Sequence, residues 1–316
     1  MHAAVVEALG QPPRYASFPD PQPADGEAVI KVSAAGLHPI VKAIASGAHY
    51  SATGEVPMVP GIDGAGTLED GTRVYFGGVR KPWGTMAEHA AVPRSMCVPL
   101  PDGLDSATAA AIANPGMSAW VSLKDRAEIL PGETVLILGA TGVAGQLAIQ
   151  VARQLGAKRI IGAGRNIDAL LDANVDEVIA LTQPEADLRE AFVVEAVAGI
   201  DVVIDYLWGR PTELLLEALA KGFKASATHR TRLVEVGQSA GPTITLPGST
   251  LRSVDLTLLG SGFGAAKIDQ ILAAIPQLFA LAAKGALKID VETVPLAEVE
   301  TAWSRADKGR RIVFTP

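Results

Sequence analysis

Hydrophobic and polar positions follow two different patterns along the chain. In the first third, short apolar runs such as residues 28–32 and 72–76 stand between clusters of Pro, Gly and Asp. Short runs with turn-forming flanks are typical of β-strands, and residues 86–92 form a weaker candidate because they are rich in alanine. Prolines recur throughout this part and disfavour long helices. We therefore expect a β-rich region here.

Helical patterning begins after residue 102. Residues 104–113 are rich in alanine and contain Asp105 and Ser106 near their start, which favours a capped helix. Pro115 and Gly116 are expected to end this helix, and residues 117–127 are expected to form another. The sequence thus predicts two helices before the next strand.

From residue 133, continuous apolar runs alternate with helical segments. The predicted strands are residues 134–138, 159–163, 177–181, 201–205, 231–236 and 253–259. The predicted helices are residues 146–155, 168–173, 186–198, 213–221 (with Thr212 as N-cap) and 267–284. Uninterrupted β-branched runs between helices indicate a parallel sheet covered on both faces. The predicted fold class is therefore α/β, with a doubly wound parallel sheet.

The last segments return to the pattern of the first third. Residues 289–294 and 311–314 again have strand character. A doubly wound domain inserted into a β-rich domain explains this order. We place the inserted domain at residues 116–265, and the β-rich domain at residues 1–115 together with 266–316.

The segment with the clearest chemistry is residues 139–145, with the sequence GATGVAG. It follows a predicted strand and opens a predicted helix, as a dinucleotide-binding loop does. Glycines let backbone N–H groups approach a phosphate, and a helix N-terminus favours its negative charge. The alternative is a turn that serves only tight strand–helix packing. The candidate cofactor contacts here are Thr141, Gly142, Val143, Ala144 and Gly145.

The end of the second strand of this pattern contains Gly164, Arg165 and Asn166. In dinucleotide folds an acidic residue there binds the ribose 2′-hydroxyl of NAD, whereas Arg pairs with the 2′-phosphate of NADP. No Asp or Glu stands at this strand end. We therefore predict NADPH as the cofactor, the alternative being a solvated Arg at a helix start.

Composition narrows the expected compartment and partners. The single Cys97 excludes an intramolecular disulfide framework and a cysteine-rich zinc lobe, and it fits a reducing compartment. A formal net charge of −7 without a basic run argues against nucleic acid as a partner. No apolar stretch is long enough for a bilayer, and the N-terminus does not resemble a signal peptide. We expect a cytoplasmic protein without a membrane partner.

Several motifs together resemble one family. They are residues 35–39 (AGLHP), 46–50 (SGAHY), 60–66 (PGIDGAG), 139–145, 164–166 and 309–313 (GRRIV). Over nearly its whole length the chain resembles zinc-independent medium-chain dehydrogenases/reductases of the quinone oxidoreductase (zeta-crystallin-like) group. The resemblance implies a Rossmann dinucleotide-binding domain inserted into a GroES-like catalytic domain.

The resemblance also implies that no metal is bound. The zinc-dependent branch of the family has Cys at about His38, a His-Glu pair at about residues 62–63, and a third ligand near Asn114. Only His38 and Asp63 could serve here, and two weak ligands do not make a zinc site. Without a Lewis acid, reduction of a polarised acceptor is easier than alcohol oxidation. We therefore predict NADPH-dependent hydride transfer to a quinone or an α,β-unsaturated carbonyl.

The remaining candidates match motifs that line the family's substrate cleft. Tyr50 and His38 are candidate catalytic groups that would hydrogen-bond a carbonyl oxygen or deliver a proton. The alternative for each is a satisfied residue of the cleft wall. Trp83 and Phe263 are candidate substrate walls. Further cofactor contacts implied by the resemblance are Ser118, Leu207, Val236, Gly237, Gly260 and Ser261.

Two other functions stay open from the sequence. One is an enoyl-thioester reductase, and the other is a non-catalytic NADPH-binding protein. We also expect a homodimer, because the apolar run at residues 254–259 lies at the predicted sheet edge, where an exposed strand is a template for pairing. A mean hydropathy of +0.27 is high for a monomer and agrees with that expectation.

Overall fold

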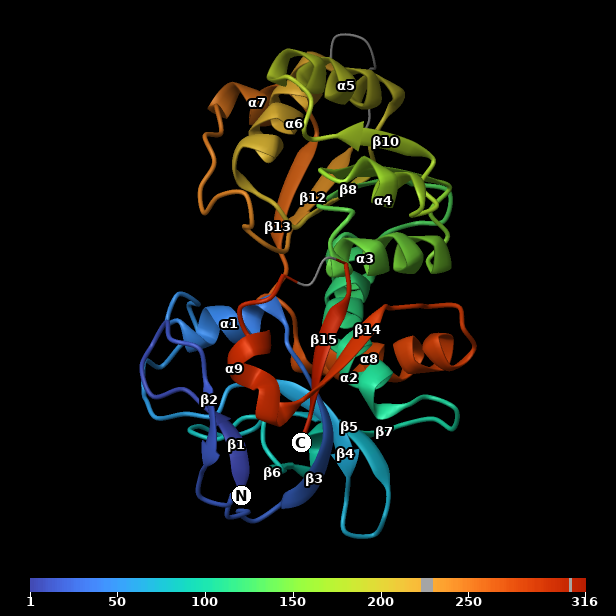
Figure 1. The fold of residues 1–316 in the computed structure, drawn as a ribbon. Helices are drawn as coiled ribbons and strands as arrows, with labels where there is room; N and C mark the ends of the chain where they lie inside the picture. The colour runs from blue at the N-terminus through green and yellow to red at the C-terminus, as the bar shows by residue number, and fades with distance from the viewer. Residues whose placement is uncertain (223–229, 307–308) are drawn as a thin grey trace. The chain divides into compact units, whose positions relative to one another are not determined.

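The computed structural model describes residues 1–222, 230–306 and 309–316. The described chain divides into two compact units (Figure 1). One comprises Met1–Asn114 with Ile275–Pro316, and the other comprises Pro115–Ala274. Each unit has its own sheet and its own hydrophobic core.

The first unit is built on a seven-stranded sheet of order β14-β15-β3-β4-β5-β7, with β6 also paired to β3. Its strands are β3 (Glu27–Gly36), β4 (Asp63–Thr67), β5 (Arg73–Gly77), β6 (His89–Pro93), β7 (Cys97–Pro99), β14 (Val291–Pro295) and β15 (Arg311–Thr315). A separate two-stranded sheet joins β1 (His2–Val5) to β2 (Arg14–Ser17). The strands expected at residues 28–32 and 72–76 are confirmed, whereas in residues 86–92 the strand begins only at His89. Because β15 pairs antiparallel with β3, the C-terminal segment completes the N-terminal sheet.

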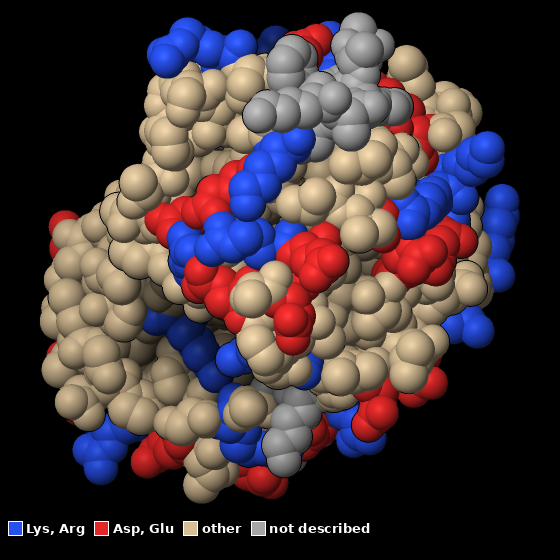
Figure 2. All heavy atoms as spheres, turned by 90° about the horizontal axis from the view of Figure 1, so that it is seen from above, with Lys and Arg blue, Asp and Glu red and all other residues tan. Residues whose placement is uncertain are grey.

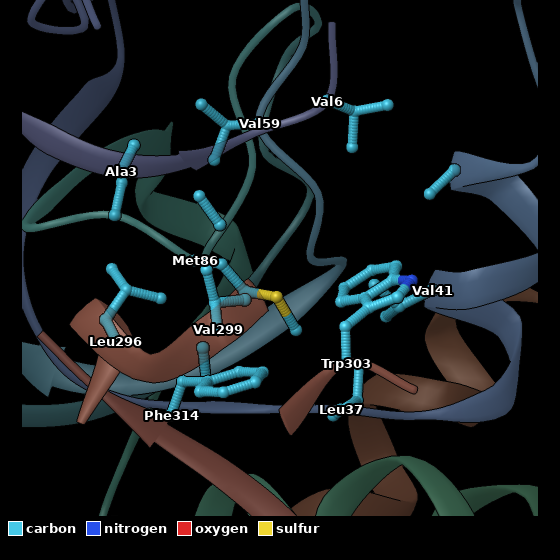
Figure 3. Close-up of a cluster of buried hydrophobic side chains, with 14 of the residues drawn as sticks. Ala3, Val6, Leu37, Val41, Val59, Met86, Leu296, Val299, Trp303 and Phe314 are labelled. Carbon is cyan, nitrogen blue, oxygen red and sulfur yellow. The ribbon is translucent and has the colours of Figure 1, made fainter. Parts of the chain in front are cut away.

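Short helices and turns close the core of the first unit. They are α1 (Pro39–Ala45), α9 (Val299–Ala302) and η3 (Leu296–Glu298). A further 3-10 helix, η1 (Arg94–Met96), contributes no buried residue. In Figure 3, Met86 points toward the rings of Phe314 and Trp303, with Val41 of α1 and Val299 of α9 beside them. Burial of such apolar surface stabilises a fold by about 25 cal/mol per Å². This core connects segments from both ends of the chain.

The second unit contains a six-stranded parallel sheet of order β10-β9-β8-β11-β12-β13. Its strands are β8 (Thr134–Leu138), β9 (Arg159–Gly164), β10 (Glu177–Ala180), β11 (Val202–Asp205), β12 (Thr231–Glu235) and β13 (Leu256–Gly260). Four successive residues of β8, 135–138, are fully buried. Successive side chains of a strand point to opposite faces, so both faces of the sheet are covered. The predicted α/β fold class is confirmed.

Helices alternate with these strands along the chain. They are α3 (Val143–Gln154), α4 (Ile167–Leu171), α5 (Glu185–Ala198), α6 (Gly209–Gly222) and α7 (Gly248–Ser253). Phe192 of α5 and Leu215 of α6 share one core with Leu136 and Val203 of the sheet. Outside this core, Arg189 and Arg210 pair with glutamates of both helices. Figure 2 shows acidic and basic side chains interspersed on the visible part of the face that it draws.

Pro115 does not end a helix, so the expected break at Pro115 and Gly116 is wrong. α2 (Ser106–Trp120) runs through both residues and continues into a π-helix, η2 (Val121–Arg126). Asp105 does cap its start, because its Oδ1 accepts a hydrogen bond from the backbone N–H of Thr108 at 2.8 Å. A proline inside a helix costs roughly 3 kcal/mol. Residues 109–113 are all fully buried, and we attribute the continuous helix to this tertiary packing.

Other predicted boundaries also shift. α6 begins at Gly209, so Thr212 is not its N-cap but lies inside the first turn, where its buried hydroxyl donates to Asp205 Oδ2 at 2.5 Å. Pro211 falls in that first turn, where helices tolerate a missing N–H. Residues 253–255 are not strand, because a short helix, α7, follows Pro247 and β13 starts at Leu256. The predicted C-terminal helix is α8 (Ile268–Ala283), which likewise contains a proline, Pro276.

Candidate functional site

The loop after β8 is a tight turn that joins β8 to α3 and is hydrogen-bonded to β9. Gly139 has a φ of 88°, a conformation that glycine adopts without strain. The backbone N–H groups of Gly139 and Ala140 both donate to the carbonyl of Ala163 on β9, at 2.9 and 3.0 Å. α3 begins at Val143, directly after the loop. The strand, loop and helix N-terminus that a phosphate site needs are therefore present together.

The three glycines of this loop differ in what requires them. A Cβ on Gly145 would lie 2.2 Å from the Gly139 carbonyl oxygen and 2.7 Å from Ala140 Cα, so packing excludes a side chain there. At Gly142 the nearest heavy atom would lie 3.5 Å away, and its φ of −75° suits any residue. The fold itself therefore leaves open space at Gly142. A backbone that must approach a phosphate needs such space.

The end of β9 lies beside this loop. A Cβ on Gly164 would lie 2.7 Å from Thr141 Cγ2, so the two segments are in close contact. Arg165 is exposed, and its guanidinium has no ion-pair or hydrogen-bond partner among residues 1–222, 230–306 and 309–316. Asn166 caps α4, because its Oδ1 accepts from the Ala169 N–H at 3.2 Å. The cation that follows the adjacent strand, Arg165, is thus free to bind an anion.

Backbone groups of the next strands complete the same edge of the sheet. The Gly237 N–H donates to the Asp205 carbonyl at 3.2 Å, and the Ser261 N–H donates to the Glu235 carbonyl at 2.8 Å. These bonds place the ends of β11, β12 and β13 next to one another. Ligands of doubly wound sheets bind at the carboxyl ends of the strands. The residues that the structure brings to this edge are Leu207, Val236, Gly237, Gly260 and Ser261.

A buried carboxylate, Asp205, holds the turn after β11. Its Oδ1 accepts from the N–H groups of Leu207 and Trp208 at 2.8 and 2.9 Å, and Thr212 donates to its Oδ2. Burial raises the pKa of Asp205, although these donors act against the rise. The sequence prediction did not include Asp205, although an acidic residue that ends an apolar strand is a signal that could have identified it.

Two other predicted contacts of the second unit have a simpler setting. Ser118 is half-buried inside α2. Phe263 follows β13 and remains 44% exposed, so an apolar ring is available to a ligand or a partner.

In the first unit, His38 is buried with Asp63 and Tyr75. The Tyr75 hydroxyl donates to Asp63 Oδ2 at 2.8 Å, and His38 Nε2 lies 3.2 Å from Asp63 Oδ1 without hydrogen-bond geometry. Burial and the neighbouring charge of Asp63 raise the pKa of Tyr75. The His38 side chain is fully buried. His38 can therefore contact an acceptor, as predicted, only if the residues around it move.

Tyr50 has the opposite setting. Its side chain is 72% exposed, and its ring lies 4.1 Å from that of His49, centroid to centroid, with a tilt of 32°. His49 was absent from the predicted site residues, although it stands in the same motif, residues 46–50. An accessible phenol beside an imidazole offers two groups that can bind a carbonyl oxygen.

Trp83, the other predicted wall residue of this unit, is fixed from two sides. Its Nε1 donates to the Pro19 carbonyl at 3.0 Å, and the Arg80 guanidinium lies 5.7 Å from the centre of its ring. The ring is half-buried. It therefore forms an ordered apolar surface rather than a mobile one.

Comparison with known proteins decides the family. Residues 24–102 match the alcohol dehydrogenase GroES-like domain. A probable NADPH-dependent quinone reductase of Emericella nidulans is 30% identical over 366 aligned positions that cover 100% of both chains. The chain belongs to the quinone oxidoreductase group of the medium-chain dehydrogenases/reductases.

Solved structures of this group have the same fold. The quinone oxidoreductase of Thermus thermophilus, whose structure was also determined in complex with NADPH, is 29% identical and superposes with a TM-score of 0.81 over 100% of both chains. A phenolphthiocerol synthesis polyketide synthase of Mycobacterium bovis is 31% identical over 72% of this chain, which spans only 11% of that much longer protein. The chain is thus similar in fold to a solved quinone oxidoreductase and in sequence to a segment of a much longer protein.

The zinc positions of the wider superfamily fit a metal poorly in this member of the quinone oxidoreductase group. His38 and Asp63 are the two candidate ligands, and the described residues contain no group of three or more His, Cys, Asp or Glu side chains that could hold a metal ion.

Cys97 is half-buried at β7, and burial raises the pKa of its thiol. Within the same described ranges, no helix is long and apolar enough to cross a membrane.

Proposed function

We propose that the chain is an NADPH-dependent reductase that transfers a hydride to a quinone or an α,β-unsaturated carbonyl without a metal. The observation that carries the cofactor is the open backbone at Gly142 in a strand–loop–helix turn, with the unpaired guanidinium of Arg165 after the adjacent strand. Two relatives support the same assignment. The one from Emericella nidulans is named as a probable NADPH-dependent quinone reductase, and the one from Thermus thermophilus was solved in complex with NADPH.

The proposed cofactor contacts divide by the part of NADPH they would hold. Within Thr141 to Gly145, the Gly142 N–H donates to the Gly139 carbonyl at 3.1 Å, and the other backbone N–H groups would hold the pyrophosphate. Arg165, with Asn166 and Gly164, would hold the 2′-phosphate. NADPH supplies the hydride when bound. The contacts proposed for the nicotinamide half are Ser118, Leu207, Val236, Gly237, Gly260 and Ser261.

The proposed acceptor contacts lie mainly in the first unit. Tyr50 would hydrogen-bond the carbonyl oxygen or deliver the proton that completes the reduction. His38 is the second proposed group; its side chain is fully buried, so its neighbours would have to move before Nδ1 met the acceptor. Trp83 and Phe263 would offer apolar surface to a planar acceptor. Reduction of a conjugated carbonyl suits this set, because the negative charge that forms on oxygen is already delocalised.

The decisive experiment mixes the purified chain with NADPH and a panel of quinones, enones and enoyl thioesters, with and without a metal chelator. We expect loss of NADPH absorbance with a quinone or an enone at the same rate in chelator. Sensitivity to the chelator would overturn metal independence. Tight binding of NADPH without turnover of any acceptor would instead favour a non-catalytic NADPH-binding protein.

An enoyl-thioester reductase is the second candidate function. The observation in its favour is the match over 72% of this chain to a segment of a polyketide synthase. The same panel separates the two, because an enoyl-thioester reductase would turn over the thioester at least tenfold more efficiently than the matching simple enone.

A further inference from the structure

The backbone after α1 fixes the position of His49. The N–H groups of Ala48 and His49 both donate to the carbonyl of Ala43 in the last turn of α1, at 3.0 and 3.1 Å. Gly47 makes this possible with a φ of 79°, a conformation that suits glycine at a helix C-terminus. The His49 backbone is therefore tied to the last turn of α1, although His49 lies beyond the end of that helix.

The hydrogen bonds of the His49 ring define its tautomer. The backbone N–H of Ser51 donates to Nδ1 at 3.2 Å, and the Ser51 hydroxyl lies 2.7 Å from the same atom. A backbone N–H can only donate, so Nδ1 must be an acceptor and carry no proton. The hydroxyl then donates to Nδ1 as well, and the ring proton resides on Nε2. Among the described residues, Nε2 has no hydrogen-bond partner.

The same contacts favour a neutral ring. A second proton on the imidazole would have to sit on Nδ1, where it would meet the Ser51 N–H. Burial acts in the same direction, because it lowers the pKa of His49. A neutral imidazole with a fixed Nε2–H is a donor whose direction is set before any ligand arrives, and such a donor can stabilise a charge that develops on oxygen.

We infer that His49 donates its Nε2–H to the carbonyl oxygen of the acceptor, with the tilted Tyr50 ring beside it and Ser51 as the positioning residue. The inference rests on the proposed function. The hydride adds to the electrophilic carbon and the π electrons move onto oxygen. One proton, from Tyr50 or from water, then completes the reduction. It adds to the α-carbon of an enone, or to the oxygen of a quinone, whose hydride-bearing carbon then passes a proton to the second oxygen to give the hydroquinone. His49 keeps its own proton throughout, since a neutral imidazole is a hydrogen-bond donor and not an acid at neutral pH.

A matched pair of variants separates the donor from the ring. His49→Phe keeps an aromatic ring on Tyr50 but has no N–H, whereas His49→Gln loses the ring and keeps an N–H at about the position of Nε2. We expect His49→Phe to lower kcat/KM for the quinone or enone by about 10- to 100-fold, the effect of one hydrogen bond to a charged oxygen. His49→Gln should retain activity within about threefold, and NADPH affinity should not change in either variant.

The chain offers a control for the ring pair itself. His2 stacks on Tyr15 with centroids 5.3 Å apart, so His2→Phe makes the same change in a second His–Tyr pair. It should leave kcat/KM unchanged. Wild-type kinetics in His49→Phe would overturn the role of His49 while leaving the proposed function intact. No turnover by the wild type with any acceptor would overturn both.

The tautomer can be tested without activity. Long-range ¹H–¹⁵N NMR of ¹⁵N-histidine-labelled protein, assigned by comparison with His49→Phe, should show a neutral ring protonated at Nε2. A ring protonated at Nδ1 would overturn the inference, even if His49→Phe were too unstable to assay.

Discussion

At the scale of single residues, we predict opposite effects on stability for alanine at Gly142 and at Gly145. Gly142→Ala should leave the free energy of unfolding within about 1 kcal/mol, because nothing lies within 3.5 Å of the new Cβ. It should weaken NADPH by at least about tenfold, since the Cβ would occupy the space proposed for a phosphate. Fluorescence titration and chemical denaturation measure the two effects. Unchanged NADPH affinity would remove the main support for the proposed cofactor site.

Gly145→Ala is the matched control. Its Cβ would lie 2.2 Å from a backbone oxygen, so the loop must shift, and overpacking of this kind costs about 1–3 kcal/mol. We expect a lower denaturation midpoint even without cofactor. If both variants lost the same stability, the distinction between a glycine needed by the fold and one needed by the ligand would not hold.

Arg165 carries the discrimination between the two nicotinamide cofactors. A charge-assisted hydrogen bond contributes roughly 1.5–3 kcal/mol, so Arg165→Ala should weaken NADPH by about 10- to 150-fold. NADH has no 2′-phosphate, and its affinity should stay nearly the same. Titration of each variant with both cofactors provides the control within one experiment. An equal loss for NADPH and NADH would contradict the assignment.

Local sequence was sufficient for some of the candidate residues and insufficient for others. The loop at residues 139–145 could be found because glycine spacing, strand and helix all occur within one short segment. The pairing of His38 with Asp63 and Tyr75 could not, because it depends on which strands become neighbours. His49 lay within a quoted motif, but its tautomer follows from a backbone N–H that sequence patterns do not reveal.

At the scale of elements, we predict a pH-dependent stability from Asp205 and Glu235, which lie at the neighbouring ends of β11 and β12. Burial, and secondarily the charge of Asp205, raise the pKa of Glu235. When the pKa of a carboxyl is higher in the folded state than in the unfolded state, protonation of that carboxyl favours folding. This stabilisation is fully present at low pH and is lost as pH rises through the folded-state pKa. Glu235→Gln should therefore stabilise the chain near pH 7, by about 0.5 kcal/mol because solvent screens a half-exposed group.

The measurement for Glu235 is a series of denaturation curves across pH. The advantage of Glu235→Gln should shrink toward zero as pH falls below the model-peptide range for Glu, about 4. Glu55 is an exposed residue of the first unit, and Glu55→Gln is the matched substitution measured beside it. An advantage of Glu235→Gln that grew toward acid would show that the sign of the shift is wrong.

Helix boundaries show where element-level patterns fail. Pro115 and Thr212 were both assigned by their intrinsic preferences, as a breaker and as a cap. In the fold, Pro115 lies in a helix with a buried alanine-rich face, and Thr212 binds the buried Asp205. Propensities of about 1–3 kcal/mol yield to tertiary contacts of similar size. Asp105, with an exposed side-chain contact to Thr108, kept its predicted role.

At the scale of the whole molecule, the fold class followed from the order of patterns more than from any single element. Uninterrupted apolar runs that alternate with helical segments indicated strands covered on both faces. The return to strand character at residues 289–294 and 311–314 indicated an inserted domain. The sequence could not give the register that joins β15 to β3, because that pairing spans most of the chain. Loop closure over such distances leaves no local signal.

The edge of the parallel sheet leads to the last prediction, a homodimer. β13 is the terminal strand, and its residues Leu256 to Leu259 are partly exposed in the single chain. An apolar edge strand with unpaired backbone groups is a template for a second strand. Pairing of two copies through β13 would bury these side chains and satisfy both edges in one two-fold interface. Light scattering at micromolar concentration should therefore give twice the chain mass of 32.7 kDa. Thr257→Lys, which places a charge on the edge, should give the single-chain mass with NADPH binding retained, whereas Thr257→Val should remain dimeric. A wild-type mass of one chain would leave the edge without a partner copy and overturn the prediction.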